Sequence, residues 1–286
     1  MQSLKQKLVD FLLDNPSELK EIYQEFETEN PTTIRGRLNE NIGKVFKRIG
    51  RGVYLADNGK SKALIIEGDS WEVIKEIDDE SIDTIITDSP YTCLDKYYNV
   101  GTSRKRNLNK SVGFETRDID KELLQEMLRV LKPNGHFFSF MPTSNKDTYD
   151  YNHNFIEMSK EIGFIFNKIW IWDKQVIGMG YSGRNRYEQI FFLSKGKRRK
   201  AYNFSIADLL SHKRIASSHR LHNAEKPKEL IKDIMKFSNK ENDVVLDTFA
   251  GSLVVAQAGQ ELNINTICIE IDSEMIRKSI EVRMIK

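Results

Sequence analysis

The sequence predicts an α/β protein with a mostly parallel central sheet, preceded by a small basic domain. From residue 62 onward, short apolar runs rich in β-branched residues alternate with longer segments of helical periodicity, the pattern of strands joined by crossover helices. One run, residues 83–87, is suited to a strand that is covered on both faces. The first 57 residues lack this alternation, so we expect them to form a separate unit.

The main domain is expected to span residues 62–286. Its expected strands are residues 63–67, 83–87, 135–141, 164–172, 187–193, 243–246 and 266–269. Its expected helices are residues 71–77, 121–131, 149–162, 227–237, 253–262 and 273–282.

Residues 1–57 are expected to form a winged-helix-like DNA-binding domain. Helical spacing predicts two helices on either side of residues 15–17 and a third after Pro31, and residues 50–52 predict the turn of a hairpin. Acidic residues gather in the first half and basic residues in the second, so only the second half would face phosphates. The residues expected to contact DNA here are Arg35, Arg37, Lys47, Arg48 and Arg51. The alternative is a helical cap or a dimerisation domain whose charges are merely solvated.

Composition places the chain among ordinary globular proteins, with 39% apolar and 30% charged residues in 286. No apolar run approaches the roughly 20 residues that span a membrane, and the first residues lack a signal core, so we expect a cytoplasmic protein without a membrane partner. Cys93 and Cys268 lie far apart and without metal-ligand spacing, which disfavours a disulfide framework or a metal site. Cys268 is expected in the core.

The tetrapeptide Asp88-Ser89-Pro90-Tyr91 follows the expected strand at residues 83–87. Ligands of open α/β sheets bind outside the carboxyl ends of the strands. Aromatic residues and the basic cluster 104–106 follow the tetrapeptide. The sequence therefore predicts a catalytic loop beside a loop that attracts phosphates.

A second candidate site follows the expected strand at residues 243–246. Gly251 permits a tight turn into a helix whose first amides would face a ligand. About twenty residues further, Glu270 ends the next strand, where an acid can accept both hydroxyls of a ribose. No G-x-G-x-x-G motif is present, and Phe249 and Leu253 would crowd a pyrophosphate, which disfavours a nicotinamide cofactor.

These motifs together resemble the beta group of DNA amino-methyltransferases, in which the catalytic tetrapeptide precedes the cofactor turn. The tetrapeptide is similar to their (Asp/Asn/Ser)-Pro-Pro-(Tyr/Phe) motif, and residues 222–272 resemble their S-adenosylmethionine half. The resemblance covers residues 62–284 and implies a Rossmann-like methyltransferase fold. It divides the domain into a catalytic half at 62–194, a short basic recognition region at 195–221 and a cofactor half at 222–286.

The resemblance implies methyl transfer from S-adenosylmethionine to the exocyclic amino group of a base flipped out of duplex DNA. The lone pair of that nitrogen is delocalised into the ring, so acceptors must bind its hydrogens. Asp88 and the carbonyl of Ser89, held by Pro90, would accept them, and Tyr91 would stack on the base. An aspartate in the first motif position favours adenine, and the amino group of cytosine is the alternative.

The resemblance also implies a set of cofactor residues. They are Asp69, Asp88, Lys226, Asp247, Phe249, Ala250, Gly251, Ser252, Glu270 and Ile271. Structural alternatives exist for several: Asp69 and Ser252 as helix caps, Lys226 as a solvated surface lysine, and Phe249 as a core residue. No metal ligand is expected.

Two positions depart from the pattern of the family. Ser89 replaces the usual first proline, and Leu253 replaces the glycine that commonly follows Gly-Ser. A catalytically inactive, sequence-specific DNA-binding regulator is therefore an alternative function.

Two further basic clusters are expected to contact DNA. Their residues are Arg104, Lys105, Arg106, Lys197, Arg198 and Arg199. The alternative is that these side chains only keep loops soluble. The expected partners are double-stranded DNA, a second copy in a homodimer, and a cognate restriction endonuclease.

Overall fold

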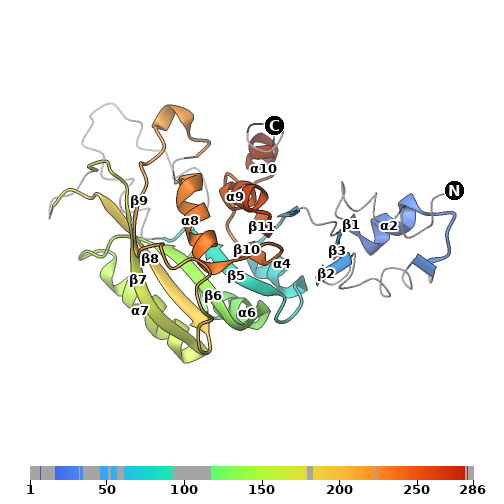
Figure 1. Cartoon of the computed structure of the whole chain (residues 1–286), viewed down its shortest axis with the longest axis horizontal. Coiled ribbons are helices and arrows are strands. Elements are labelled where there is room, and N and C mark those ends of the chain that lie inside the picture. The colour runs from blue at the N-terminus through green and yellow to red at the C-terminus, as the bar shows by residue number, and fades with distance from the viewer. Residues whose placement is uncertain are drawn as a thin grey trace.

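Figure 1 shows the computed structural model of the chain. It describes residues 7, 17–31, 33–34, 46–50, 53–56, 61–92, 117–178, 183–222, 224–280 and 282.

The main domain is built on an eight-stranded sheet with the order β4-β11-β10-β5-β6-β8-β7-β9. The strands are β4 (Ala63–Glu67), β5 (Ile82–Thr87), β6 (Leu131–Met141), β7 (Phe164–Asp173), β8 (Tyr187–Lys195), β9 (Leu209–Ser211), β10 (Val244–Asp247) and β11 (Asn265–Glu270). All neighbours from β4 to β6 are parallel, β8 is antiparallel to both of its neighbours, and β9 is parallel to β7. The predicted mostly parallel sheet is confirmed.

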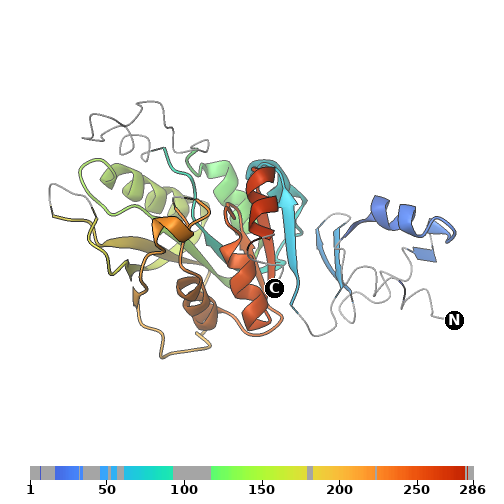
Figure 2. The same ribbon diagram turned by 90° about the horizontal axis from the view of Figure 1, so that it is seen from above.

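Helices cover both faces of this sheet. They are α4 (Ser70–Val73), α6 (Lys121–Val130), α7 (Tyr149–Ile162), α8 (Lys228–Ser238), α9 (Val254–Leu262) and α10 (Ser273–Ser279), with 3₁₀ turns η1 (Ile74–Glu76) and η2 (Ser217–His219). Successive strand residues point to opposite faces, so Phe137 packs with α6 and α7 whereas Phe138 packs with α8 and α9. Figure 2 shows these two helix pairs on opposite sides of the sheet.

The expected elements of the main domain are present, with ends that differ by a few residues. The expected helix at 71–77 is α4 followed by η1, because the carboxylate of Asp69 caps the first turn and the chain then tightens. Strand β6 begins at Leu131, four residues before the expected start. The short edge strand β9 was not expected, since three residues are too few for a periodic signal. Cys268 is buried in the core, as expected.

The amino-terminal segment contains a three-stranded antiparallel sheet with the order β1-β3-β2. Its elements are β1 (Ser17–Glu18), α2 (Leu19–Glu25), β2 (Phe46–Gly50) and β3 (Val53–Ala56). The expected hairpin and the helix after residue 17 are therefore present, and Ile22 and Ile34 are buried. Lys47 and Arg48 lie on β2, whereas Arg35, Arg37 and Arg51 lie outside the described residues. The winged-helix assignment and the domain boundaries stay predictions.

Within the described part of the chain, no helix has the length and apolar character needed to cross a bilayer.

Candidate active site

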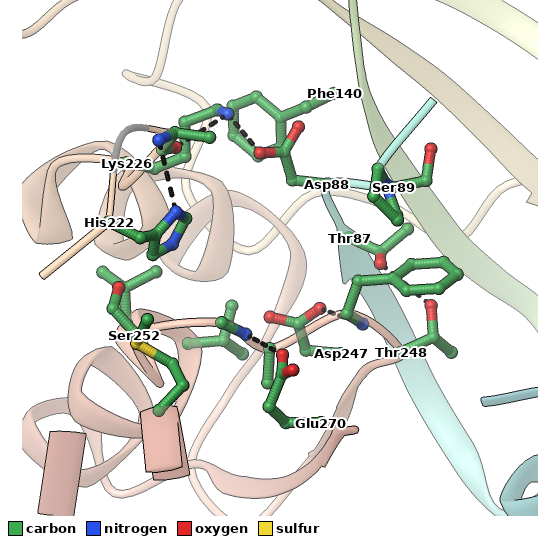
Figure 3. A pocket seen from close by; sticks show the side chains of 18 of the residues that line it. Thr87, Asp88, Ser89, Phe140, His222, Lys226, Asp247, Thr248, Ser252 and Glu270 are labelled. Carbon is green, nitrogen blue, oxygen red and sulfur yellow. Dashed lines mark hydrogen bonds and ion pairs between the residues drawn. The ribbon is translucent and has the colours of Figure 1, made fainter. Parts of the chain in front are cut away.

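The candidate site lies where the strand order of the sheet reverses. Strands β5 and β10 are parallel neighbours, but the chain leaves β5 toward β6 on one side and leaves β10 toward β11 on the other. Such a switch point opens a crevice at the carboxyl ends of the two strands. The hydroxyls of Thr87 and Thr248, just at these ends, are joined by a buried hydrogen bond of 2.9 Å (Figure 3). The two strand ends are thereby held together at the crevice.

A cavity of about 850 Å³ opens at this point. Its lining includes all the residues expected from the sequence to serve catalysis or the cofactor: Asp69, Asp88, Ser89, Pro90, Tyr91, Lys226, Asp247, Phe249, Ala250, Gly251, Ser252, Glu270 and Ile271. The expected residues, which lie up to 202 positions apart in sequence, thus share one cavity. Their individual roles stay predictions.

The cofactor turn has a backbone that requires glycine at one position. Gly251 has a φ of +48°, and a Cβ there would lie 2.8 Å from Nε2 of His222. The amide of Gly251 donates to Oε2 of Glu270 at 2.6 Å, and the amide of Asp272 donates to Oε1 at 2.9 Å. The carboxylate of Glu270 therefore fixes the turn to the end of β11.

Leu253 also adopts a left-handed conformation, with a φ of +58°. A glycine is usual at this position in the DNA amino-methyltransferases that the sequence resembles, and a side chain there costs about 1 kcal/mol or more in backbone energy. The side chain of Leu253 is completely buried among residues of the α8 and α9 face. Burial of the leucine side chain offsets the backbone cost of the left-handed conformation.

Asp247 is buried at the end of β10. Its Oδ1 accepts a hydrogen bond of 3.1 Å from the amide of Phe249. Burial raises the pKa of Asp247 to about 7, because a carboxylate loses its hydration there. This carboxyl group is consequently poised to change its protonation state near neutral pH.

Asp69 caps a helix and also lies at the cavity, and its contact with the cofactor stays a prediction. Its Oδ1 accepts from the amide of Trp71 at 3.0 Å and so caps α4, while the residue also lines the cavity. Its Oδ2 lies 3.6 Å from Arg117, whose guanidinium stacks on the Trp71 ring at 3.4 Å. The ring of Phe249 packs edge-on against Trp71, with centroids 5.7 Å apart. Trp71, Arg117 and Phe249 thus form one wall of the cavity.

The tetrapeptide 88–91 is held by backbone hydrogen bonds although its first proline is missing. The carbonyl of Ser89 accepts from the amide of Tyr91 at 3.0 Å, and the carbonyl of Pro90 accepts from the amide of Arg117 at 2.9 Å. Tyr91 is buried, and its ring lies 5.6 Å from that of Tyr151. A carbonyl oxygen has two lone pairs, so that of Ser89 can accept a second hydrogen bond.

Lys226 is buried with an exposed fraction of 7%, so the alternative of a solvated surface lysine is wrong. Its ammonium forms an ion pair with Asp88 (Figure 3). It also lies 3.6 Å from Oε2 of Glu188. Burial raises the pKa of Asp88, and Lys226 opposes that shift. Although burial disfavours a buried ammonium, Asp88 and Glu188 raise the pKa of Lys226 above its usual value. Lys226 is therefore charged at neutral pH.

Comparisons with known proteins decide the family. A family model described as DNA methylase, of the N6/N4 type, matches residues 82–281. The chain belongs to this DNA methylase family. It is 28% identical over 240 residues to the type II methyltransferase M.HpaI of Haemophilus parainfluenzae, covering 76% of this chain and 73% of that protein. It is 24% identical over 251 residues to the DNA adenine methyltransferase YhdJ of Escherichia coli (strain K12), covering 77% and 82%.

A solved structure shares the fold. The PvuII DNA methyltransferase, described as cytosine-N4-specific, superposes with a TM-score of 0.58 at 17% identity, covering 77% of this chain and 86% of that chain. The predicted Rossmann-like methyltransferase fold is thereby confirmed. The family match makes this chain a DNA methyltransferase, as expected. The family uses S-adenosylmethionine, and the solved structure of the M1.HpyAVI–SAM complex superposes with a TM-score of 0.58 at 22% identity, covering 79% of this chain and 100% of that chain.

The cavity of this methylase also contains residues that were not expected from the sequence. They are Arg117, Glu188 and His222 among others. Burial lowers the pKa of His222 to about 4, so the imidazole is neutral at pH 7. Its Nδ1 accepts from the amide of Ala224 at 3.2 Å, which leaves Nε2 beside Gly251. Among the described residues no cluster of three or more His, Cys, Asp or Glu is arranged to hold a metal.

The basic residues of the expected recognition region separate into two groups. Strand β8 is antiparallel to β6, so residues 195–200 lie at the edge of the sheet opposite the cavity, while Arg214 and Arg220 line the cavity. Lys197 and Arg198 are exposed at that opposite edge. The expected DNA contacts Arg104, Lys105 and Arg106 lie outside the described residues.

The expectation that Arg199 contacts DNA is wrong. Its guanidinium donates to the carbonyl of Ser238 at 2.6 Å and to Oγ1 of Thr84 at 2.7 Å. It also lies 3.7 Å from Asp83, with its side chain largely buried. Arg199 therefore stabilises the amino edge of the sheet. Of the cluster Lys197, Arg198 and Arg199, it is the one residue that is not exposed.

Proposed function

We propose that this DNA methyltransferase transfers a methyl group from S-adenosylmethionine to the exocyclic amino group of an adenine that is flipped out of duplex DNA. One observation carries the proposal: Asp88 and the cofactor turn, which follow neighbouring strands, open into the same cavity. An acceptor for the amino hydrogens and a binding turn for the methyl donor therefore lie within one substrate-sized space.

The residues present fit S-adenosylmethionine, which carries an ammonium and a sulfonium. The cavity is lined by the carboxyl groups of Asp88, Asp247 and Glu270, which favour a cationic ligand. The left-handed glycine at position 251 leaves the backbone of the turn bare toward the cavity. When bound, the cofactor supplies a methyl group activated by its attachment to positively charged sulfur. Asp247 would face the ammonium, and Glu270 would face the ribose.

The remaining chemistry falls to the tetrapeptide. The carboxylate of Asp88 and the carbonyl of Ser89 would each accept one hydrogen of the amino group, which frees the nitrogen lone pair from the ring. Tyr91 would contact the face of the base. Adenine is favoured by the aspartate in the first motif position and by the name of YhdJ. The amino group of cytosine is the second candidate, since the family covers N4 as well as N6 methylation.

A modified-base readout tests this proposal. The chain is expressed in a host without DNA methylation, and the genomic DNA is sequenced. We expect methylated adenines in one sequence motif, lost in Asp88→Ala and kept in the control Asp208→Asn, which breaks an ion pair with Lys168 outside the cavity lining. Methylated cytosines would favour the second candidate. Unmodified DNA from soluble protein that binds S-adenosylmethionine would contradict the proposal and favour an inactive DNA-binding regulator.

We also propose that residues 1–57 form a DNA-binding domain of the winged-helix type. The observation in favour is the small sheet β1-β3-β2 beside α2, with Lys47 and Arg48 on the hairpin strand β2.

The name of M.HpaI, a type II methyltransferase, makes a cognate restriction endonuclease the expected companion. A homodimer stays a prediction. If the hairpin contacts phosphates, Lys47→Ala with Arg48→Ala will reduce the salt dependence of DNA binding by about two counterions.

A further inference from the structure

Four side chains of alternating charge are linked in a series that runs from Lys174 to Asp88. Lys174 Nζ lies 3.4 Å from Oε1 of Glu188, and Oε2 of Glu188 lies 3.6 Å from Nζ of Lys226. Lys226 in turn forms an ion pair with Oδ2 of Asp88. The four residues come from four separate places in the chain, namely the residue after β7, strand β8, the segment before α8 and the residue after β5. The fold therefore assembles this series, and no local motif does.

The ammonium of Lys226 is fixed from several directions. In addition to its two carboxylates, it donates to the carbonyl of Ala224 at 3.3 Å, and it lies 5.0 Å from the centre of the Phe140 ring. Only 8% of its side chain is exposed. A buried ammonium with these partners has little freedom to reorient. It therefore defines where the carboxylate of Asp88 lies.

The contact with Lys226 uses only one oxygen of Asp88. Among the described residues, Lys226 is the side chain that donates a hydrogen bond to Asp88, and the acceptor is Oδ2. Oδ1 accepts none from the part of the chain that the structure describes. One carboxylate oxygen is thus anchored, and the other is available to an incoming amino group.

We propose that Lys226 and Glu188 are positioning residues for Asp88. Lys226 anchors one carboxylate oxygen of Asp88. Glu188 holds Lys226 in place and shares the positive charge of its ammonium, so that Asp88 is not fully neutralised. The inference rests on the proposed function, in which Asp88 accepts a hydrogen of the target amino group. Without Glu188, a single ammonium would neutralise Asp88 and weaken it as an acceptor. Without Lys226, the buried Asp88 would take up a proton and become a weaker acceptor.

The charged groups around this series set the direction of each effect. Asp88 faces Lys226, Glu188 and Asp247. Glu188 also faces Lys174 and Arg214, and the surroundings of Lys226 include His222 and, through it, Arg220. Lys226 lowers the pKa of Asp88 and Glu188 raises it, against a background in which burial is the largest cause. Removing Lys226 and removing Glu188 must therefore move the titration of Asp88 in opposite directions.

The test is the pH dependence of methyl transfer to duplex DNA for wild type, Lys226→Met and Glu188→Gln, together with the affinity for S-adenosylmethionine. In Lys226→Met we expect the acid limb of kcat to move up by about one pH unit or more, so that activity at a pH below both limbs falls about tenfold and recovers as the pH is raised. In Glu188→Gln we expect the acid limb to move down, with a lower kcat on the plateau. The control is Lys132→Met, which removes the lysine paired with Asp83 at the other end of β5. It should leave the pH profile unchanged.

Several outcomes would overturn the inference. One is an acid limb that moves in the same direction in Lys226→Met and Glu188→Gln. Another is an acid limb that moves in neither of these variants. A third is a Lys226→Met variant that loses affinity for S-adenosylmethionine while the acid limb of its pH profile stays in place. That result would mean that Lys226 binds the cofactor and does not position Asp88. If Lys226→Met does not fold, Lys226→Arg replaces it and should keep the wild-type limb, while Glu188→Gln alone still tests the opposite shift. A wild-type protein without methyl transfer would contradict the proposed function itself, which separates the two failures.

Discussion

Strand β5 carries an aspartate near each end, and the two have different surroundings. At the amino edge, Asp83 accepts from Lys132 at 2.8 Å and from the amide of Val244 at 2.9 Å, and Arg199 lies 3.7 Å away. At the carboxyl edge, Asp88 is paired with Lys226 and lines the cavity. Both are aspartates that pair with a lysine, yet only Asp88 is among the residues that line the cavity.

The difference shows that an ion pair alone does not identify a site. The pair of Asp83 is closed, because backbone and side-chain donors from β6, β10 and the segment after β8 surround it. The pair of Asp88 is open on one side, and its buried ammonium leaves one carboxylate oxygen available. Buried charge without full satisfaction is costly, and it is retained where function uses it.

The largest expected effect distinguishes the two ends of β5 directly. Asp88→Asn should lower kcat for methyl transfer by about two to three orders of magnitude, because an amide is a weaker acceptor than a carboxylate. It should also cost some stability, because Glu188 is then the one carboxylate among the described residues that pairs with the buried Lys226. Asp83→Asn should affect stability alone, with a loss of about 2 kcal/mol in the free energy of unfolding and a nearly unchanged kcat. Comparable activity losses in both variants would mean that the two ends do not differ in function.

A second pair of positions compares two left-handed glycines. Gly251→Ala should weaken S-adenosylmethionine binding about tenfold, since a Cβ would lie 2.8 Å from Nε2 of His222 and push the turn out of place. Gly163→Ala at the end of α7 shares the left-handed backbone, but its Cβ would be 3.5 Å from the nearest atom, in Leu128. It should cost about 1 kcal/mol of stability and leave cofactor affinity unchanged. Calorimetric titration and thermal unfolding of both variants would measure these effects.

The two ends of β10 give a prediction about pH. With a pKa of about 7, Asp247 is protonated below neutral pH, and a cationic cofactor favours its carboxylate form. Binding of S-adenosylmethionine should therefore release a proton below pH 7, and affinity should fall about tenfold from pH 8 to pH 6. Asp247→Asn should abolish that dependence. The pKa of Asp243, at the amino end of β10, is also raised, first by burial, but Asp243 lies outside the cavity lining. Its change to Asn should keep the pH dependence.

Most of the fold and much of the site were accessible from the sequence because their signals are local. The strands that end in Asp88 and Asp247 are short apolar runs, and the motif residues follow them directly in the chain. Parallel strands bring such carboxyl ends together without further information. This is why the residues expected in the site share one cavity.

The sequence did not reveal the features that depend on strand direction and on three-dimensional neighbours. Glu188 belongs to the cavity only because β8 runs antiparallel, which brings the start of that strand to the carboxyl edge. The same reversal carries residues 195–200 to the far edge. A run of lysine and arginine residues in the sequence does not indicate the edge of the sheet at which it will lie. Nor does it indicate that the side chain of Arg199 will bind the carbonyl of Ser238 inside the protein.

The smallest expected effect compares the basic residues of those two edges. Arg214 lines the cavity, whereas Lys197 is exposed at the opposite edge of the sheet. Arg214→Ala should raise KM for DNA about threefold and reduce the salt slope of binding by about one, as loss of a phosphate contact does. Lys197→Ala should change KM by less than about twofold, because a charge more than a Debye length from the phosphates is screened. An equal reduction of the salt slope in the two variants would mean that DNA contacts both edges of the sheet. The difference between the two ends of β5 would then not extend to DNA binding.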